Sequence, residues 1–283
     1  MRLLIGLVCS VAFSIVPLVG CSDATAGGGS GGAGTGGTAG VGGTGGTAGV
    51  GGTGGAAGVG GTGGAAGVGG TGGISAVGLV AYYPFNGNAN DESGNGNDGT
   101  ALGGAVLTSD RFGNADAAYS FDGTSGYIQI PDSPDFDFNQ PITLTAWIYL
   151  NDNTKGGIVG QWGPGGESGD AFTLGVKDGK ARLTLLVPGL YELSSVSDLG
   201  LEEWLFVSVV YDGTSLKLFV NGTPDASDNI MVDQVDSTQP VTIGFERILS
   251  GEPAYLNGTI DDVRIYRIPL SDGEILQLYN VSD

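Results

Sequence analysis

A glycine-rich tract between Gly27 and Gly73 limits most strongly what this chain can fold into. It carries four copies of a nonapeptide, AGVGGTGG plus one variable residue, which begin at Ala39, Ala48, Ala57 and Ala66. No side chain in the tract is larger than Val, so packed repeats would bury almost no apolar surface against the large entropy cost of ordering glycine. Collagen would require a regular Gly-X-Y repeat with proline, and a Ca2+-binding nonapeptide roll would require an Asp in each copy. The tract therefore predicts a flexible tether, with about 35–40 Å between its ends.

The charge and residue composition exclude several classes of function. Ten Lys and Arg stand against thirty Asp and Glu, which gives a formal net charge of -20. An acidic surface repels nucleic acid and anionic lipid headgroups, so we expect no nucleic-acid partner. The chain has no His, which excludes imidazole-based catalysis and His-ligated metal sites. Its two cysteines, Cys9 and Cys21, both precede the tether, so no disulfide framework stabilises the rest of the chain.

The segment before Cys21 has the features of a secretory signal peptide. Met1-Arg2 precedes an apolar run from Leu3 to Val19, which is too short and too weakly flanked for a transmembrane helix. The sequence Leu-Val-Gly-Cys that ends at Cys21 resembles a bacterial lipobox; the alternative is an ordinary signal peptide with a chance Cys. We expect lipidation of Cys21 to be the only membrane attachment. Ser22 favours the bacterial outer membrane, with the protein exposed at the cell surface or in the periplasm.

A different pattern begins at Ile74 and continues to Asp283. Short apolar segments alternate with Gly, Asn, Asp and Pro at intervals of about 8–12 residues, which is typical of an all-β sandwich or barrel. The segments predicted as strands are Tyr82–Phe85, Ala117–Phe121, Tyr127–Ile130, Ile142–Leu150, Gly157–Gln161, Phe172–Val176, Ala181–Val187, Trp204–Tyr211, Ser215–Val220, Val241–Phe245 and Thr259–Arg267. Ser271 and Glu274 form a capping box that predicts one short helix, which we expect on the rim of the sandwich.

Turn residues and alternation predict how some of these strands are arranged. Asp122–Gly126 and Asp212–Thr214 each connect two predicted strands, which indicates two hairpins. Ile142–Leu150 is apolar on one face and carries Thr, Trp and Tyr on the other, so we expect burial on both sides.

These segments resemble, in order, the bacterial pattern of laminin G-like domains in the concanavalin A-like jelly-roll family. The stretches that carry the resemblance are Gly78–Gly99, Arg111–Gly123, Tyr127–Phe136, Ile142–Tyr149, Val209–Gly222 and Leu256–Asn280. The resemblance implies an all-β sandwich of two curved antiparallel sheets, with the first strand beside Asp261–Tyr266. We therefore expect a signal peptide over residues 1–20, a lipidated Cys and tether over 21–73, and a jelly-roll domain over 74–283.

Some glycoside hydrolases share this sandwich, so the positions of the acidic residues bear on whether this chain is an enzyme. Retaining enzymes need two carboxylates roughly 5–5.5 Å apart, usually on one strand face. The pattern Glu-x-Asp-x-Glu is absent from the chain. Asp135 and Asp137 alternate but follow Pro134 in a loop, and the adjacent Asp261 and Asp262 would point to opposite faces of an extended strand. We therefore expect no enzymatic activity.

The polar loop after the first strand is rich in the oxygen ligands that Ca2+ prefers. It contains Asn86 and Asp91, and the resemblance places it beside Asp262. We predict a structural Ca2+ site with Asn86, Asp91 and Asp262 as ligands. The alternative is that the Asn and Asp side chains bond their own backbone, as in ordinary turns. Thr124 and Ser125 stand where relatives commonly carry two acidic residues, which removes one source of ligands.

Aromatic side chains beside polar loops are candidates for stacking on a sugar. Trp147 and Trp204 match core positions of the family, so we interpret them as packing residues. Trp162, Tyr191 and Tyr255 lie near segment ends and are the candidate ligand-binding residues. For each of the three, the alternative is a partly buried loop anchor.

Together these features predict a monomeric, non-enzymatic recognition module at the cell surface, with a carbohydrate or glycoconjugate as its ligand. The alternatives are a protein-binding adhesion or assembly module, whose partner is an extracellular protein, and an accessory domain without a ligand of its own. A glycoside hydrolase is the least favoured alternative, because the carboxylate pattern is missing.

Overall fold

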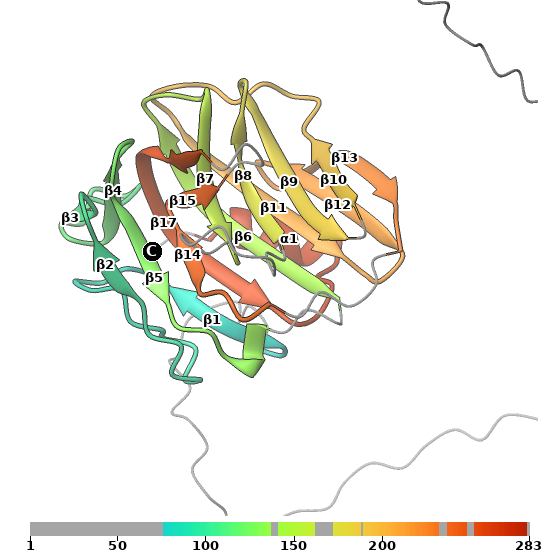
Figure 1. Ribbon diagram of the computed structural model, residues 1–283, viewed down its shortest axis with the longest axis horizontal. Coiled ribbons are helices and arrows are strands. Elements are labelled where there is room, and N and C mark those ends of the chain that lie inside the picture. The colour runs from blue at the N-terminus through green and yellow to red at the C-terminus, as the bar shows by residue number, and fades with distance from the viewer. Residues whose placement is uncertain are drawn as a thin grey trace, which may run out of the picture. The chain divides into compact units, whose positions relative to one another are not determined.

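The computed structural model describes residues 76–136, 141–161, 172–187, 189–231, 237–247 and 252–281 (Figure 1). The predicted signal peptide, Cys21 and the glycine-rich tether lie outside these residues. No helix in the described part is long and apolar enough to cross a membrane.

Two antiparallel sheets form the domain, as the sequence predicted for a jelly roll (Figure 1). The larger sheet contains, in order, β13 (Thr223–Asn229), β12 (Ser215–Val220), β11 (Trp204–Tyr211), β6 (Ile142–Leu150), β17 (Asn257–Tyr266), β4 (Ala118–Asp122) and β3 (Val106–Thr108), and β1 (Leu79–Tyr83) also pairs with β17. The second sheet contains β10 (Gly189–Ser194), β9 (Lys180–Val187), β8 (Phe172–Lys177), β7 (Lys155–Gly160), β14 (Val241–Ile243), β5 (Tyr127–Ile130) and β2 (Thr100–Leu102). A small hairpin joins β15 (Phe245–Arg247) to β16 (Pro253–Tyr255), and Pro134–Phe136 forms one 3-10 turn, η1. We call the two main sheets the eight-stranded and the seven-stranded sheet.

The inner faces of the two sheets enclose the main core because alternate residues of each strand are apolar. On β6, for example, Leu144, Ala146 and Ile148 belong to this core. Each fully buried Leu or Ile side chain contributes about 1.5–3 kcal/mol. The opposite face of β6 is also buried, and its Trp147 packs in a second apolar cluster with Phe206. Burial on both faces of β6 was the expectation from its sequence, and it is confirmed.

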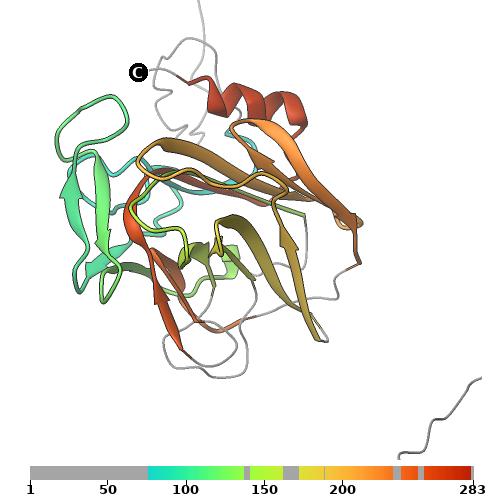
Figure 2. The same cartoon turned by 90° about the horizontal axis from the view of Figure 1, so that it is seen from above.

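The C-terminal helix α1 (Asp272–Tyr279) supplies the cover for this second cluster (Figure 2). Ser271 and Glu274 form the predicted capping box, in which each side chain accepts a hydrogen bond from the other's backbone N–H. The ring of Tyr279 stacks on Trp147 with 5.5 Å between centroids. The expected position on the rim is therefore wrong, because the apolar outer residues of β6 and β11 need a partner that the rim would not provide.

The strand β17 changes its neighbour halfway along its length. Its residues Asn257–Ile260 pair with β4, and Val263–Tyr266 pair with β1, while β6 follows its other side. The register against β6 shifts between Asp261 and Arg264, and Asp262 at this point has a φ of +52°. Such a bulge adds a residue and bends the strand. It therefore marks the place where one sheet edge ends and the next begins.

Arg111 binds both carboxylates of this bulge. Its guanidinium lies 2.5 Å from Asp261 Oδ2 and 3.3 Å from Asp262 Oδ2, and all three side chains are less than one-tenth exposed. Arg264 pairs with the other oxygen of Asp262 at 2.9 Å and lies over the ring of Tyr82. The expectation that Asp261 and Asp262 point to opposite faces is wrong, because it assumed an extended strand and the backbone here is bulged.

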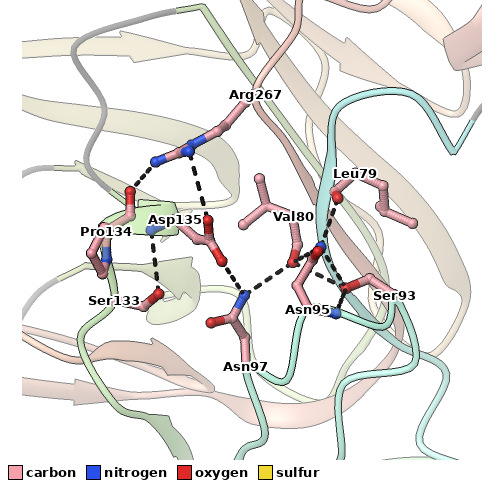
Figure 3. A network of polar contacts seen from close by, with 9 residues as sticks. All are labelled: Leu79, Val80, Ser93, Asn95, Asn97, Ser133, Pro134, Asp135 and Arg267. Carbon is pink, nitrogen blue, oxygen red and sulfur yellow. Dashed lines mark hydrogen bonds and ion pairs between the residues drawn. The ribbon is translucent and has the colours of Figure 1, made fainter. Parts of the chain in front are cut away.

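The polar loop after β1 hydrogen-bonds to the edge of that strand (Figure 3). The Val80 carbonyl accepts hydrogen bonds from Ser93 Oγ at 3.1 Å and from Asn97 Nδ2 at 3.0 Å. Asp91 Oδ1 accepts the Tyr82 N–H at 2.9 Å. An edge strand leaves its backbone groups without partners and open to other chains. The side chains of the loop therefore take the place of a neighbouring strand.

Asn97 continues this network to a second segment (Figure 3). Its amide contacts Asp135 Oδ2 at 3.4 Å, and Asp135 lies 3.6 Å from the guanidinium of Arg267. Arg267 also donates to the Pro134 carbonyl. The turn η1, the polar loop and the end of β17 are thus fixed to one another around β1.

Two further expectations about strands need correction. The segment Asp122–Gly126 is not a hairpin, because β4 belongs to the eight-stranded sheet and β5 to the seven-stranded sheet. Six strands were not predicted separately: β2, β3, β10, β13, β15 and β16. Four of them have three residues each, which is too short for an alternation to appear, and β13 is TPDASDN, which has little β propensity.

We expect Asn97→Ala to lower the free energy of unfolding by about 1–3 kcal/mol, because it leaves the buried Val80 carbonyl with fewer partners. Urea denaturation of wild type and variant measures the change. Asn90→Ala is the matched control, since Asn90 lies in the same loop and is exposed. An equal loss in both variants would contradict the role given to Asn97.

Burial raises the pKa of Asp261 to about 7, even though the nearby Arg111 lowers it. The ordinary value is 3.8, so the folded state binds the proton more tightly than the unfolded chain. The stabilising contribution is therefore complete below pH 3.8 and is lost as the pH rises through about 7. We expect Asp261→Asn, which cannot titrate, to flatten the fall in unfolding free energy over this pH interval. An unchanged slope in thermal or urea denaturation at these pH values would contradict this expectation.

Candidate functional site

A row of polar and glycine residues crosses the outer face of the seven-stranded sheet. Each member stands directly opposite the next on the neighbouring strand, from β10 to β2: Glu192, Thr184, Thr173, Gly160, Thr242, Gln129 and Thr100. Their chain neighbours, such as Leu183 and Leu185 on β9, belong to the main core, so the row faces away from it. At about 4.8 Å between strands the row is on the order of 30 Å long. We call it the polar row.

Two hydroxyls in the middle of the polar row lack hydrogen-bond partners. Thr173 and Thr184 are only 1% and 4% exposed, and their Oγ1 atoms have no partner within the described residues. By contrast, Thr242 Oγ1 donates to the Phe245 carbonyl at 3.1 Å. A buried hydroxyl without a partner costs about 1–3 kcal/mol. Such atoms are where a bound molecule or ordered water would contribute most.

A chain of ion pairs lies beside these hydroxyls. Both oxygens of Glu246 accept hydrogen bonds from Arg182 Nη2, at 2.7 and 2.9 Å, and Arg182 Nη1 binds Glu192 at 2.7 Å. Lys177 Nζ lies 3.7 Å from the same Glu192 oxygen. Burial raises the pKa of Glu246, against the opposing attraction of Arg182. The charges on this face therefore neutralise one another within the sheet.

The hairpin of β15 and β16 passes over this face, and glycines make room for it. A Cβ added at Gly157 would come within 2.2 Å of the Phe245 backbone, and one at Gly175 within 3.0 Å of Glu246 Oε2. Larger residues at either position would displace the hairpin and with it Glu246. The two glycines thus place the acceptor of Arg182 over the sheet.

The arrangement suits binding rather than bond cleavage. Glu192 and Glu246 are two carboxylates on one face, as a glycosidase would need. Arg182, however, donates hydrogen bonds to both oxygens of Glu246. A general acid must reach within hydrogen-bond distance of the bond that it protonates. Glu246 cannot do so while this ion pair is intact.

The predicted sugar-binding aromatics have structural contacts where the structure describes them. Tyr191 faces the core side of β10, and its hydroxyl donates to Asp228 Oδ2 on β13 at 2.8 Å. This bond joins the edge strands of the two sheets, and burial together with Asp228 raises the tyrosine pKa to about 12. Tyr255 packs 5.0 Å from the ring of Phe245 and 6.3 Å from that of Tyr127. Trp162 lies outside the described residues.

The three predicted Ca2+ ligands are not brought together as a free ligand set. Asp91 accepts hydrogen bonds from the backbone of its own loop, Asn86 is exposed, and Asp262 is paired with Arg111 and Arg264. Within the described residues, no group of three or more acidic or Cys side chains is placed to hold a metal ion. These carboxylate oxygens are engaged, so they do not fit a Ca2+ site in this arrangement. Ca2+ binding stays a prediction from the sequence.

A groove of about 430 Å3 lies on the eight-stranded sheet beside the start of α1. Val210 and Leu270 contribute apolar surface to it. Lys217 and Asp272, which also line it, form an ion pair at 2.8 Å. The groove therefore offers fewer unengaged polar groups than the polar row, and we assign the candidate site to the row.

Sequence reasoning missed the polar row, although part of its signal was present. In the segments FTLGVK and ARLTL every second residue is Thr, Gly, Arg or Lys between core aliphatics. This alternation predicts an outward polar face for one strand. It does not show that seven such residues come into register across a sheet.

The domain is similar in fold to several solved structures, and no curated protein matches its sequence. Domain 4 of AbnA, an extracellular arabinanase of family GH43 from Geobacillus stearothermophilus, solved with arabinotriose, has a TM-score of 0.59 and 20% identity over 71% of this chain and 98% of that one. The binding domain of Paraclostridial Mosquitocidal Protein 1 has a TM-score of 0.57 and 16% identity, over 71% and 52% of the two chains. The ligand-binding domain of botulinum neurotoxin serotype D, solved with N-acetylneuraminic acid, has a TM-score of 0.57 and 17% identity, over 71% and 50%.

This chain thus spans about half the length of the toxin domains. At these identities the likeness concerns the fold. The sequence itself matches the laminin G-type model described as concanavalin A-like lectin/glucanases superfamily, over residues 122–276. The match covers the strands from the end of β4 to β17 and most of α1, and so includes six of the seven members of the polar row. The chain therefore belongs to the concanavalin A-like lectin/glucanases superfamily, as a laminin G-like domain.

Proposed function

We propose that this protein is a lipid-anchored, non-enzymatic recognition module that binds a saccharide along the polar row. The observation that carries the proposal is the pair of buried hydroxyls, Thr173 and Thr184, which have no partner within the described residues. Saccharides present many hydroxyls that can donate to and accept from such groups. Both hydroxyls are covered in this structure, so a ligand would have to displace the groups above them, and bonds to the ligand would then recover the cost of two unpaired polar atoms.

The relatives support a binding function for this fold. The arabinanase domain was solved with arabinotriose and the serotype D neurotoxin domain with N-acetylneuraminic acid. Both are saccharide complexes of domains with the same architecture. Because one fold hosts many functions, the proposal for this chain rests on its own polar row.

The predicted acylation of Cys21 adds a location to this function. A tether of about 35–40 Å would separate the domain from the lipid surface. The domain starts at β1 in the eight-stranded sheet, whereas the polar row lies on the seven-stranded sheet. The strand that follows the tether and the proposed binding face therefore belong to different sheets.

We expect Thr184→Val to weaken saccharide binding about 3–10-fold, which corresponds to one hydrogen bond of about 0.5–1.5 kcal/mol. A glycan array identifies the ligand, and isothermal titration of wild type and variant measures the loss. Thr145→Val is the matched control, because Thr145 is also buried with an unpartnered hydroxyl but lies on the eight-stranded sheet. Arrays without any bound glycan, or an equal loss in the control, would contradict the proposal and favour a protein ligand.

Lipid anchoring is tested separately by Cys21→Ala. We expect this variant to leave the membrane fraction and to lose incorporation of labelled fatty acid, because no other part of the chain is expected to attach it. Cys9→Ala is the control, since Cys9 lies inside the predicted signal peptide. A membrane-bound Cys21→Ala variant would show that a different attachment exists.

A further inference from the structure

Three cations beside the polar row, Arg182, Lys177 and Lys180, are paired with carboxylates. Arg182 is bound by Glu246 and Glu192, and Lys177 shares the same Glu192 oxygen. Lys180, the next cation on β9, lies 2.8 Å from Asp198. Lys155 stands opposite Lys177 at the end of β7 and is exposed, so water screens it.

Glu192 is the carboxylate at the end of the polar row, and it contacts two of these cations. It is the end member of the polar row on the edge strand β10, and one of its oxygens contacts both Arg182 and Lys177. Its side chain is 31% exposed and that of Lys177 is 47% exposed, so both are open to a ligand. Arg182, at 5% exposure, is buried beneath them. A ligand that reaches this end of the row therefore meets a carboxylate before it meets the guanidinium.

An anionic saccharide would be opposed at this position for two reasons. To reach Lys177 or Arg182, its carboxylate or sulfate would have to displace Glu192, whose like charge repels it at short range. The chain also has a formal net charge of -20, which repels a polyanion at long range. A neutral saccharide needs no such displacement and can use the unpartnered hydroxyls of Thr173 and Thr184.

Resting on the proposed function, we infer that the polar row binds neutral saccharides and that Glu192 is the specificity-determining residue that excludes anionic ones. Glu192 acts by occupying the two cations that an anionic sugar would need. The domain thereby differs in ligand class from the serotype D neurotoxin domain, which was solved with the anionic N-acetylneuraminic acid.

The test compares arabino-oligosaccharides, which are neutral, with oligogalacturonates, which are anionic, by titration of the full chain in detergent at low salt. We expect wild type to bind the neutral series and to bind the anionic series at least about 10-fold more weakly. Glu192→Gln should shift this ratio by about 10-fold toward the anionic series, because it removes the negative charge beside Lys177 and Arg182. The gained affinity should fall with added salt. The Gln amide still accepts a hydrogen bond from Arg182, so we expect the variant to fold, and a thermal melt checks this.

Glu203→Gln is the matched control, because Glu203 is exposed at the start of β11 in the other sheet and the substitution changes the net charge equally. It should leave the ratio unchanged, whereas Lys177→Gln added to Glu192→Gln should remove the gain. Wild-type binding of oligogalacturonate as tight as that of the neutral series would overturn the inference and leave the proposed function standing. The same holds if Glu192→Gln leaves the ratio unchanged. A folded protein that binds no saccharide at all would overturn the proposed function and the inference together.

Discussion

The fold depends on the point where β17 exchanges β4 for β1 as its neighbour. Two acidic side chains, Asp261 and Asp262, meet there in the middle of a sheet, where unpaired buried charges would be strongly destabilising. The left-handed backbone at Asp262 turns both carboxylates toward one guanidinium, that of Arg111. The same bulge gives the eight-stranded sheet two separate edges on one side of its central strand. One edge accepts β4, which leads on to the seven-stranded sheet, and the other accepts β1, where the domain begins.

The two sheets differ in their roles: one is joined to the predicted tether, and the other carries the polar row. The eight-stranded sheet receives the chain from the predicted tether at β1, so a force on the tether would act first on the contact between β1 and β17. Asp91 and Asn97 reinforce that contact from the open edge of β1, where a further strand would otherwise stand. The seven-stranded sheet has no part in that attachment, and its outer face carries the polar row. The oxygen-rich loop thus helps to fix β1 in the domain, and the proposed recognition chemistry lies on the other sheet.

Local chemistry could be predicted from the sequence, but the partners of each strand could not. The tetrapeptide Asp-Gly-Thr-Ser occurs at Asp122 and again at Asp212, and in both places the first carboxylate accepts the backbone N–H groups of the third and fourth residues. The turn is therefore fixed by four residues. At Asp212 it closes the predicted hairpin of β11 and β12, whereas at Asp122 it leads from one sheet to the other. The difference arises from the strands beside the flanking segments, since β17 and β14 recruit β4 and β5 separately. Nothing in the sequence of the turn indicates whether its two flanking strands pair with each other or join different sheets.

The same limit explains why the residues that stand out in the sequence differ from those of the candidate site. Aromatic side chains and clustered oxygens are conspicuous, yet Tyr191 joins two sheet edges and Asp91 bonds its own loop. The polar row consists mainly of threonines. None of them is unusual within its own strand, and they form a continuous row only when the strands pair in register. Its charge balance depends on Glu246, which is separated from Arg182 by 64 positions and brought to it by a hairpin that needs glycine beneath it. The selectivity proposed for this site depends on the folded sheet. Ion pairs that join three strands determine which charged side chains a ligand would contact.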